Sequence, residues 1–218
     1  MEIRSAILER HSVRGFKDDP VPREIVEDIL SLGVRAVSAQ NVQPWKIAVV
    51  SGDAIRRLRR LNAEDFESGK VPDQPDPQLT EVQRSRAREV GRALLTAMEI
   101  EREDKNGRHQ WSCRGFRFFD APTVFLLYLE KGIDERSFRF DMGALAQNIC
   151  LAAMEYGLGT CVEYQAIMYQ RGIREVLNLS EEAFVCGIAL GYPDPEFPAN
   201  GVRSSREPLE KNVTWFDC

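Results

Sequence analysis

The chain has few histidines and no long apolar run. Two histidines, His11 and His109, are too few for a histidine-rich metal site, and no acidic cluster has calcium-loop spacing. The longest apolar run, residues 121–129, is far shorter than the roughly 20 residues that cross a bilayer. No apolar signal region follows the charged residue Glu2. We therefore predict a soluble, cytoplasmic protein with no metal and no membrane partner.

Disulfide pairs and the common catalytic motifs are also missing. The five cysteines include no CxxC pair and their number is odd, which indicates thiols in a reducing compartment, several of them buried. There is no GxSxG elbow, no GxxxxGK[ST] loop and no GxGxxG after a strand. If the protein binds a phosphate, side chains must therefore hold it.

Composition and charge are those of an ordinary globular protein. The sequence is 43% hydrophobic and 29% charged, and its 218 residues suit a single large domain. The formal net charge of −5 argues against nucleic acid as the main partner.

The apolar spacing predicts a mixture of helices and strands. Helices are expected at residues 2–10, 22–34, 137–156 and 171–177, and strands at 45–50, 122–129, 161–165 and 184–190. The strand at 122–129 is apolar on both faces, which indicates a central position. The helix at 137–156 is apolar almost all round, which suggests burial against other helices or a partner subunit. Because helices and strands do not alternate regularly, we predict one α+β domain over residues 1–218.

Residues 62–115 differ in character from the rest. Three prolines between residues 72 and 77 break any regular element, and a long charged helix is expected over residues 79–104. We interpret this stretch as a charged helical excursion from the body. It is either a solvated surface helix or a lid over a site.

Three polar clusters are candidates for ligand binding. Arg10 to Arg14 (RHSVR) and Arg203 to Arg206 (RSSR) each combine two guanidinium groups with hydroxyls, which suit phosphate oxygens. Either cluster alone is equally consistent with a solvated loop. The third cluster, SAQNVQP at residues 38–44, has more amide and hydroxyl groups than a helix-to-strand connector needs. We predict that it holds a ligand.

Taken in order, these segments resemble the FMN-dependent nitroreductase family. ERHSVRGF is similar to its R-[RH]-S-x-[RK]-x-F signature, and SAQNVQPW is similar to its S-x-x-N-x-Q-P-W signature. A small-residue helix ending in GLGT, then IALGYPD and an arginine-bearing tail, follow at matching spacing over nearly the whole chain. The resemblance implies a nitroreductase-like fold with a mixed, mainly antiparallel central sheet flanked by helices. It also implies a homodimer with FMN at the subunit interface.

The resemblance also assigns positions of this chain to cofactor binding. Arg10 and Ser12 would contact the FMN phosphate and ribityl chain, with Arg206 closing on the phosphate. Arg203 would assist Arg206 in binding the phosphate. Arg14 would reach the N1/O2 edge of the flavin, where a positive charge stabilises the reduced cofactor.

The remaining cofactor positions lie in three other places. His11 stands where the family often has arginine, and we expect it to make backbone contacts beside the cofactor. Ser38, Asn41 and Gln43 would come from the other subunit, although Ala39 replaces a frequent serine of the family. Tyr164 and Gln165 would lie beside the flavin N5 edge. Cys161 is near this place, but without a basic partner it is not expected to be a catalytic thiol.

The activity that the resemblance implies is electron transfer from NADH or NADPH, through FMN, to a nitroaromatic, a quinone or a similar small acceptor. The scheme would be ping-pong and centred on the flavin, with no catalytic acid or base from the protein. Two alternatives stay open: another flavin reaction on the same scaffold, such as reductive dehalogenation, and flavin binding without turnover. The sequence distinguishes neither the acceptor nor NADH from NADPH.

Overall fold

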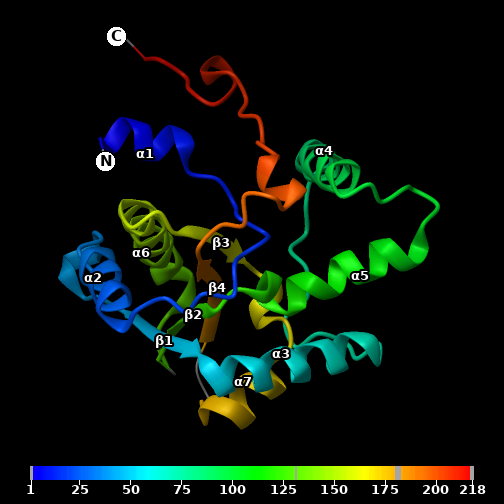
Figure 1. Ribbon diagram of the computed structural model, residues 1–218. Helices are drawn as coiled ribbons and strands as arrows, with labels where there is room; N and C mark the ends of the chain where they lie inside the picture. Colours follow the sequence, from blue (N-terminus) through cyan, green and yellow to red (C-terminus); the bar gives the residue numbers. More distant parts are fainter. Residues whose placement is uncertain (1, 131, 180–182, 217–218) are drawn as a thin grey trace.

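The computed structural model describes residues 2–130, 132–179 and 183–216 (Figure 1). Its α-helices are α1 (Ile3–Glu9), α2 (Arg23–Gly33), α3 (Gly52–Glu67), α4 (Glu81–Ala97), α5 (Lys105–Phe116), α6 (Glu135–Glu155) and α7 (Gln170–Leu177). Its strands are β1 (Trp45–Ser51), β2 (Thr123–Leu129), β3 (Gly159–Glu163) and β4 (Ala183–Gly191). Short 3-10 turns are η1 (Ala39–Asn41), η2 (Phe118–Asp120), η3 (Gln165–Ile167), η4 (Pro198–Gly201) and η5 (Leu209–Lys211).

The four strands form one sheet in the order β1-β2-β4-β3, and each neighbouring pair is antiparallel. β2 lies between β1 and β4, and six of its seven residues are buried. This confirms the central position predicted from its two apolar faces. A single parallel bridge, between Ser12 and Thr160, adds the segment after α1 to the outer side of β3.

Each face of the sheet is covered by helices (Figure 1). On one face, α2 and α6 pack against the strands, and Ile29, Leu145 and Ile149 are fully buried there. On the other face lie α3, α7 and the turns η2 and η3, with Leu58 and Phe184 in the core. The helix expected at residues 137–156 is confirmed as α6, which contacts α1, α2, β3 and β4.

The helix predicted over residues 79–104 is wrong in its extent. α4 begins at a capping box on Thr80 and ends at Ala97, and Glu99 has a φ of 56° that no continuing helix adopts. A new helix, α5, starts after the N-cap Asp104. Residues 62–67, placed in the excursion by the sequence, complete α3, a helix that no sequence prediction assigned. α3 packs on α5, α7 and β1 and therefore belongs to the body.

Cysteine chemistry and membrane insertion can be checked on the described ranges. Cys113, Cys150, Cys161 and Cys186 are free thiols there, and the first three are buried, whereas Cys218 lies outside the described residues. Within the same ranges, no helix combines the length and the apolarity that a membrane crossing requires.

Candidate functional site

The segment from Arg10 to Phe16 runs along the outer side of β3. Its Val13 N–H donates to the Thr160 carbonyl at 2.9 Å, and Phe16 forms a bridge with Pro193 after β4. Gly159 permits this approach, since a Cβ there would overlap the Val13 side chain. The first polar cluster is therefore fixed by backbone pairing to the end of the sheet.

Asn200, in η4, fixes the same segment from the other side. Its Oδ1 accepts from the N–H groups of Arg14 (2.7 Å) and Gly15 (3.1 Å). Its Nδ2 donates to the carbonyls of Gly15 (2.8 Å) and Asp194 (2.9 Å). The Arg203 guanidinium donates to the Asn200 backbone carbonyl at 2.6 Å. This one buried amide thus joins the N-terminal arginine cluster to the C-terminal one.

The positive charges of the two clusters meet around His11. Its ring donates from Nδ1 to the Glu9 carbonyl at 2.9 Å. Burial lowers the pKa of His11 despite that hydrogen bond, and the charges of Arg203, Arg10 and Arg14 lower it further. The structure therefore brings together Arg10, His11, Arg14 and Arg203, which the sequence placed in two distant segments.

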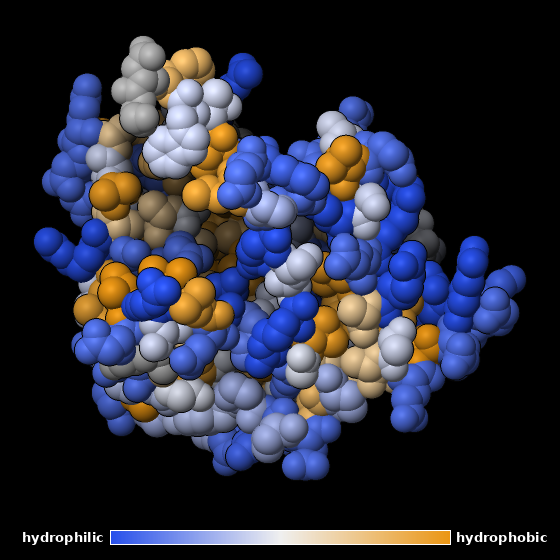
Figure 2. Space-filling view, turned by 90° about the horizontal axis from the view of Figure 1, so that it is seen from above, coloured by the Kyte–Doolittle hydropathy of each residue, from blue (hydrophilic) through white to orange (hydrophobic). Residues whose placement is uncertain are grey.

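A cavity of about 200 Å³ opens at this place. It lies between the end of α1, the turn after α6 and the start of β3, and is lined by Arg10, His11, Val13, Met154, Gly157, Leu158, Gly159, Thr160 and Pro193. Seen from above, the molecule is hollowed between the part with α1 and the C-terminal segment and the part with α4 (Figure 2).

Arg206 lies in a different place from Arg10. Its guanidinium donates to the Ser204 hydroxyl at 2.8 Å and to the Ser205 carbonyl at 2.9 Å. It lines a second cavity, against α4, where Glu207 and Arg86 form an ion pair at 3.0 Å. Arg10 and Arg206 therefore line separate cavities. Their convergence on one phosphate stays a prediction.

The SAQNVQP segment forms its own turn, anchored to α6. Ala39 N–H donates to the buried Asp141 carboxylate at 3.2 Å, and Gln43 N–H donates to the Ser38 hydroxyl at 3.1 Å. Asn41 and Gln43 have positive φ values of 60° and 47°, which costs conformational energy. Among the described residues, no hydrogen bond joins this segment to the Arg10–Arg14 segment of the same chain.

Tyr164 and Gln165 follow directly after β3. The Tyr164 hydroxyl donates to the Gln74 amide oxygen at 3.0 Å, and Gln74 Nε2 donates to the Phe184 carbonyl at 3.1 Å. The Gln165 side chain lies against α5 at Gly115, where a Cβ would overlap it. The proline-rich loop and α5 therefore both contact the segment that the sequence associated with the flavin N5 edge.

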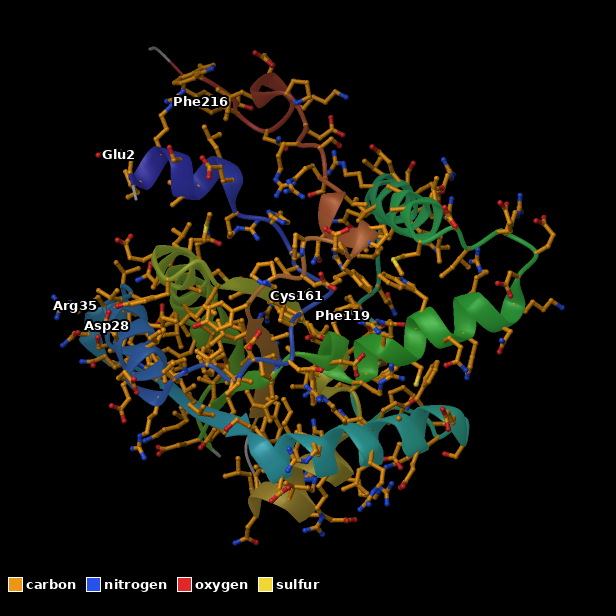
Figure 3. All side chains as sticks on the ribbon, viewed as in Figure 1. Glu2, Asp28, Arg35, Phe119, Cys161 and Phe216 are labelled. Carbon is orange, nitrogen blue, oxygen red and sulfur yellow. The ribbon has the colours of Figure 1, made fainter. Side chains whose placement is uncertain are left out.

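The turn η2 carries functional candidates that sequence reasoning missed. Phe118, Phe119 and Asp120 all have positive φ values and form a left-handed turn. No sequence pattern predicted this turn. The Arg14 guanidinium lies 5.8 Å from the centre of the Phe119 ring, a cation–π contact. Phe119 and Cys161 belong to the same core cluster, and their side chains are seen near the centre of Figure 3.

Arg114, on α5, contacts both η2 and the Arg10–Phe16 segment. Its Nη1 pairs with the Asp120 carboxylate at 3.1 Å, and its guanidinium lies 4.9 Å from the centre of the Phe197 ring. Burial lowers the pKa of Arg114, with the Asp120 charge opposing that effect. The sequence signal was only an arginine near the end of a charged helix, which does not distinguish this contact from a solvated face.

The donors present fit a phosphorylated cofactor. In a protein of net charge −5, Arg10, Arg14 and Arg203 gather around His11, yet among the described residues none of them has a carboxylate partner. Guanidinium groups that are not neutralised by the protein suit a phosphate anion. Within the described ranges, no group of His, Cys, Asp and Glu side chains has metal-binding geometry.

Comparison with known proteins identifies the family of the chain. The sequence model of the Nitroreductase family matches residues 7–192. A nitrobenzene nitroreductase of Ectopseudomonas oleovorans is 35% identical over 98% of this chain and 96% of its own. A chloronitrobenzene nitroreductase of Comamonas testosteroni is 34% identical over the same shares. The chain therefore belongs to the nitroreductase family.

A solved structure gives the same result for the fold. The crystal structure of the FMN and NADPH-dependent nitroreductase NfnB from sphigopyxis sp. strain HMH superimposes with a TM-score of 0.94, at 30% identity and full coverage of both chains. The predicted nitroreductase-like fold is thereby confirmed, with a sheet that is antiparallel in every strand pair described.

Proposed function

We propose that this protein is an FMN-dependent oxidoreductase that takes electrons from NADH or NADPH and reduces nitroaromatics, quinones or similar small acceptors by a ping-pong scheme. The observation that carries the proposal is the group of Arg10, Arg14 and Arg203 beside the cavity at the start of β3. The relatives named above support nitroaromatic acceptors, and NfnB supports FMN and NADPH. When bound, FMN would supply the chemistry by accepting a hydride and passing two electrons on.

The arginines would bind and orient the cofactor. Arg10 and Arg203 would hold the phosphate with the Ser12 hydroxyl, and Arg206 would join them from its loop. His11 would contact the same region in its neutral form, consistent with its lowered pKa. Each charge-assisted hydrogen bond contributes about 1.5–3 kcal/mol, so three of them would fix the phosphate firmly.

Arg14 would act on the flavin ring. A guanidinium at about 4 Å from a developing negative charge stabilises it by about 4 kcal/mol at an effective dielectric constant of about 20. The Phe119 ring and the Asn200 amide hold Arg14 in place for this role. Tyr164 and Gln165 would cover the N5 edge through their backbone.

A second copy of the chain would complete the site. Asn41 and Gln43 are exposed on a strained turn, with Ser38 half-buried at its start, as expected of groups that a partner subunit uses. α1 and α6 expose large apolar side chains, with Leu8 at 71% and Phe140 at 77% exposure. Exposed apolar surface of this kind favours a homodimer interface.

The test begins with the cofactor. The purified protein should be yellow, or should quench FMN fluorescence on titration, and Arg203→Ala and Arg206→Ala should each weaken FMN binding by about tenfold or more, the equivalent of 1.4 kcal/mol. Arg57→Ala, at an exposed position of α3, is the matched control. A colourless protein that takes up no FMN would refute the proposal.

Turnover is tested next under anaerobic conditions. NADH or NADPH should bleach the bound flavin, and nitrobenzene or a quinone should restore its colour. A yellow protein that neither nucleotide bleaches would instead be a flavin-binding protein without turnover. Turnover of a halotyrosine with no activity on nitrobenzene would indicate dehalogenation.

A further inference from the structure

Glu163 is a buried carboxyl group at the end of β3. It is 4% exposed, and both of its oxygens are buried without a hydrogen-bond partner among the described residues. Cys161 and Glu163 share one face of the strand because side chains alternate, and opposite Glu163 stands Gly187 of β4, which has no side chain. An unsatisfied carboxyl group in such a place requires an explanation, because natural interiors contain few of them.

Two positive charges lie near this carboxyl group but do not bind it. They are Arg14, after α1, and Arg59, on α3. Among the described residues, the hydrogen bond of the Arg14 guanidinium is a long one of 3.4 Å, to the Ser12 carbonyl, and the Arg59 guanidinium donates to the Ala121 carbonyl. The Arg59 Nε is itself buried and has no hydrogen-bond partner in the part of the chain that the structure describes.

Burial decides the protonation of Glu163. It raises the pKa of Glu163 well above its usual range, while the charges of Arg14 and Arg59 lower it by less. The titratable neighbour on the same strand is Cys161, whose thiol is kept neutral because burial raises its pKa to about 12. The Glu163 carboxyl group therefore keeps its proton to a higher pH than an ordinary glutamate does, and it is electrostatically coupled to Arg14.

Packing alone does not account for this arrangement. An apolar side chain of similar size would fill the place without an unsatisfied polar group. The position of Glu163 offers another reason, since it directly precedes Tyr164 and lies within electrostatic reach of Arg14. These are the residues that would cover the N5 and N1 edges of the flavin.

We propose that Glu163 is a positioning residue that controls how much positive charge Arg14 presents to the flavin. As a neutral acid, it leaves the positive charge of the Arg14 guanidinium free to stabilise the N1 edge of the flavin. As a carboxylate, it would neutralise that guanidinium. The inference rests on the proposed function.

The proton balance gives the proposal a measurable form. With FMN bound, a hydride from the nicotinamide would bring two electrons and one proton and would leave one negative charge beside Arg14. That charge increases the proton affinity of Glu163. Between its two pKa values, for oxidised and reduced protein, the Glu163 carboxylate takes one further proton from water per two electrons, and becomes the acid.

The first experiment measures the midpoint potential of the bound FMN against pH. Uptake of one proton per two electrons gives about 30 mV per pH unit, and uptake of two gives about twice that slope. The wild-type protein should show a steeper section at a pH above the ordinary glutamate pKa of about 4.3, whereas Glu163→Gln should keep the shallower slope throughout. Glu24→Gln, at an exposed position of α2, should behave as the wild type. Identical profiles for wild type and Glu163→Gln would overturn the inference.

The second experiment needs no cofactor. Because the folded-state pKa of Glu163 is raised, folded protein binds a proton that unfolded protein has released above about pH 4.3. The folding equilibrium of wild-type apoprotein should therefore weaken tenfold per pH unit relative to Glu163→Gln, until the folded-state pKa is reached. A general packing defect would shift the Glu163→Gln profile without changing its slope.

The two proposals can fail separately. A protein that binds no FMN refutes the proposed function, and the apoprotein profiles still report on the Glu163 proton. Parallel apoprotein profiles refute the neutral state of Glu163 and leave the proposed function standing.

Discussion

Asn200→Ala tests whether one amide holds the two arginine clusters together. The substitution removes four hydrogen bonds, two accepted from Arg14 and Gly15 and two donated to Gly15 and Asp194. At about 1 kcal/mol net for each bond, unfolding should become easier by about 4 kcal/mol. For a chain of this length that corresponds to a decrease in Tm of about 12 °C.

The assay is thermal and urea unfolding of the apoprotein, followed by titration with FMN. Binding should weaken by at least about tenfold, since the Arg14 backbone is released and Arg203 loses the carbonyl position that it contacts. Asn212→Ala is a suitable control because Asn212 is exposed in the C-terminal segment. The free energy of unfolding of this variant should stay within about 0.5 kcal/mol of the wild-type value. An Asn200→Ala protein with unchanged Tm would show that water replaces the amide at no cost, and the reasoning would fail.

Three further predictions concern the framework of the site. Asp65→Asn should destabilise the protein by about 2 kcal/mol, since it breaks the ion pair between the buried Asp65 carboxylate and the half-exposed Arg171. Burial alone would raise the pKa of Asp65, but hydrogen bonds from Arg171 and a lysine lower it. The stabilisation is therefore present above about pH 4 and is lost as the pH falls through the folded-state pKa of Asp65. If the urea midpoint of Asp65→Asn depended on acid pH in the same way as that of the wild type, this reasoning would be contradicted. Gly159→Ala should cost about 2 kcal/mol in urea unfolding, because the added methyl overlaps Val13, and an unchanged midpoint would show that the segment moves freely. Cys161 should resist iodoacetamide in the folded protein, since burial raises its pKa to about 12, and rapid labelling seen by mass spectrometry would disprove that.

Regular apolar patterns were sufficient to predict much of the fold. The run at residues 122–129 became β2, and the helix predicted at 137–156, apolar almost all round, became α6, with shifts of one or two residues. Both patterns are strong because the elements are buried on more than one side. By contrast, the helix at 79–104 was too long, because propensity alone does not show where Thr80 and Asp104 cap two separate helices.

The site was predictable only in part, and for a physical reason. Arg10 and Arg14 stand in a recognisable motif, whereas Asn200 acts through partners about 185 residues away and Glu163 through burial. The local spacing of residues in the sequence predicts neither long-range hydrogen bonding nor desolvation. The left-handed turn that carries Phe119 contradicts local preference, and the packing of its buried rings compensates for it.

The bridges that join Ser12 to Thr160 and Phe16 to Pro193 have a consequence for assembly. The first bridge covers the outer side of β3 at Thr160, so the start of that margin offers fewer unpaired backbone groups to another chain. The opposite margin is β1, where Val49 is exposed. Strand addition to this sheet should therefore be easier at β1 than at the start of β3, where the Arg10–Phe16 segment hinders pairing with another chain.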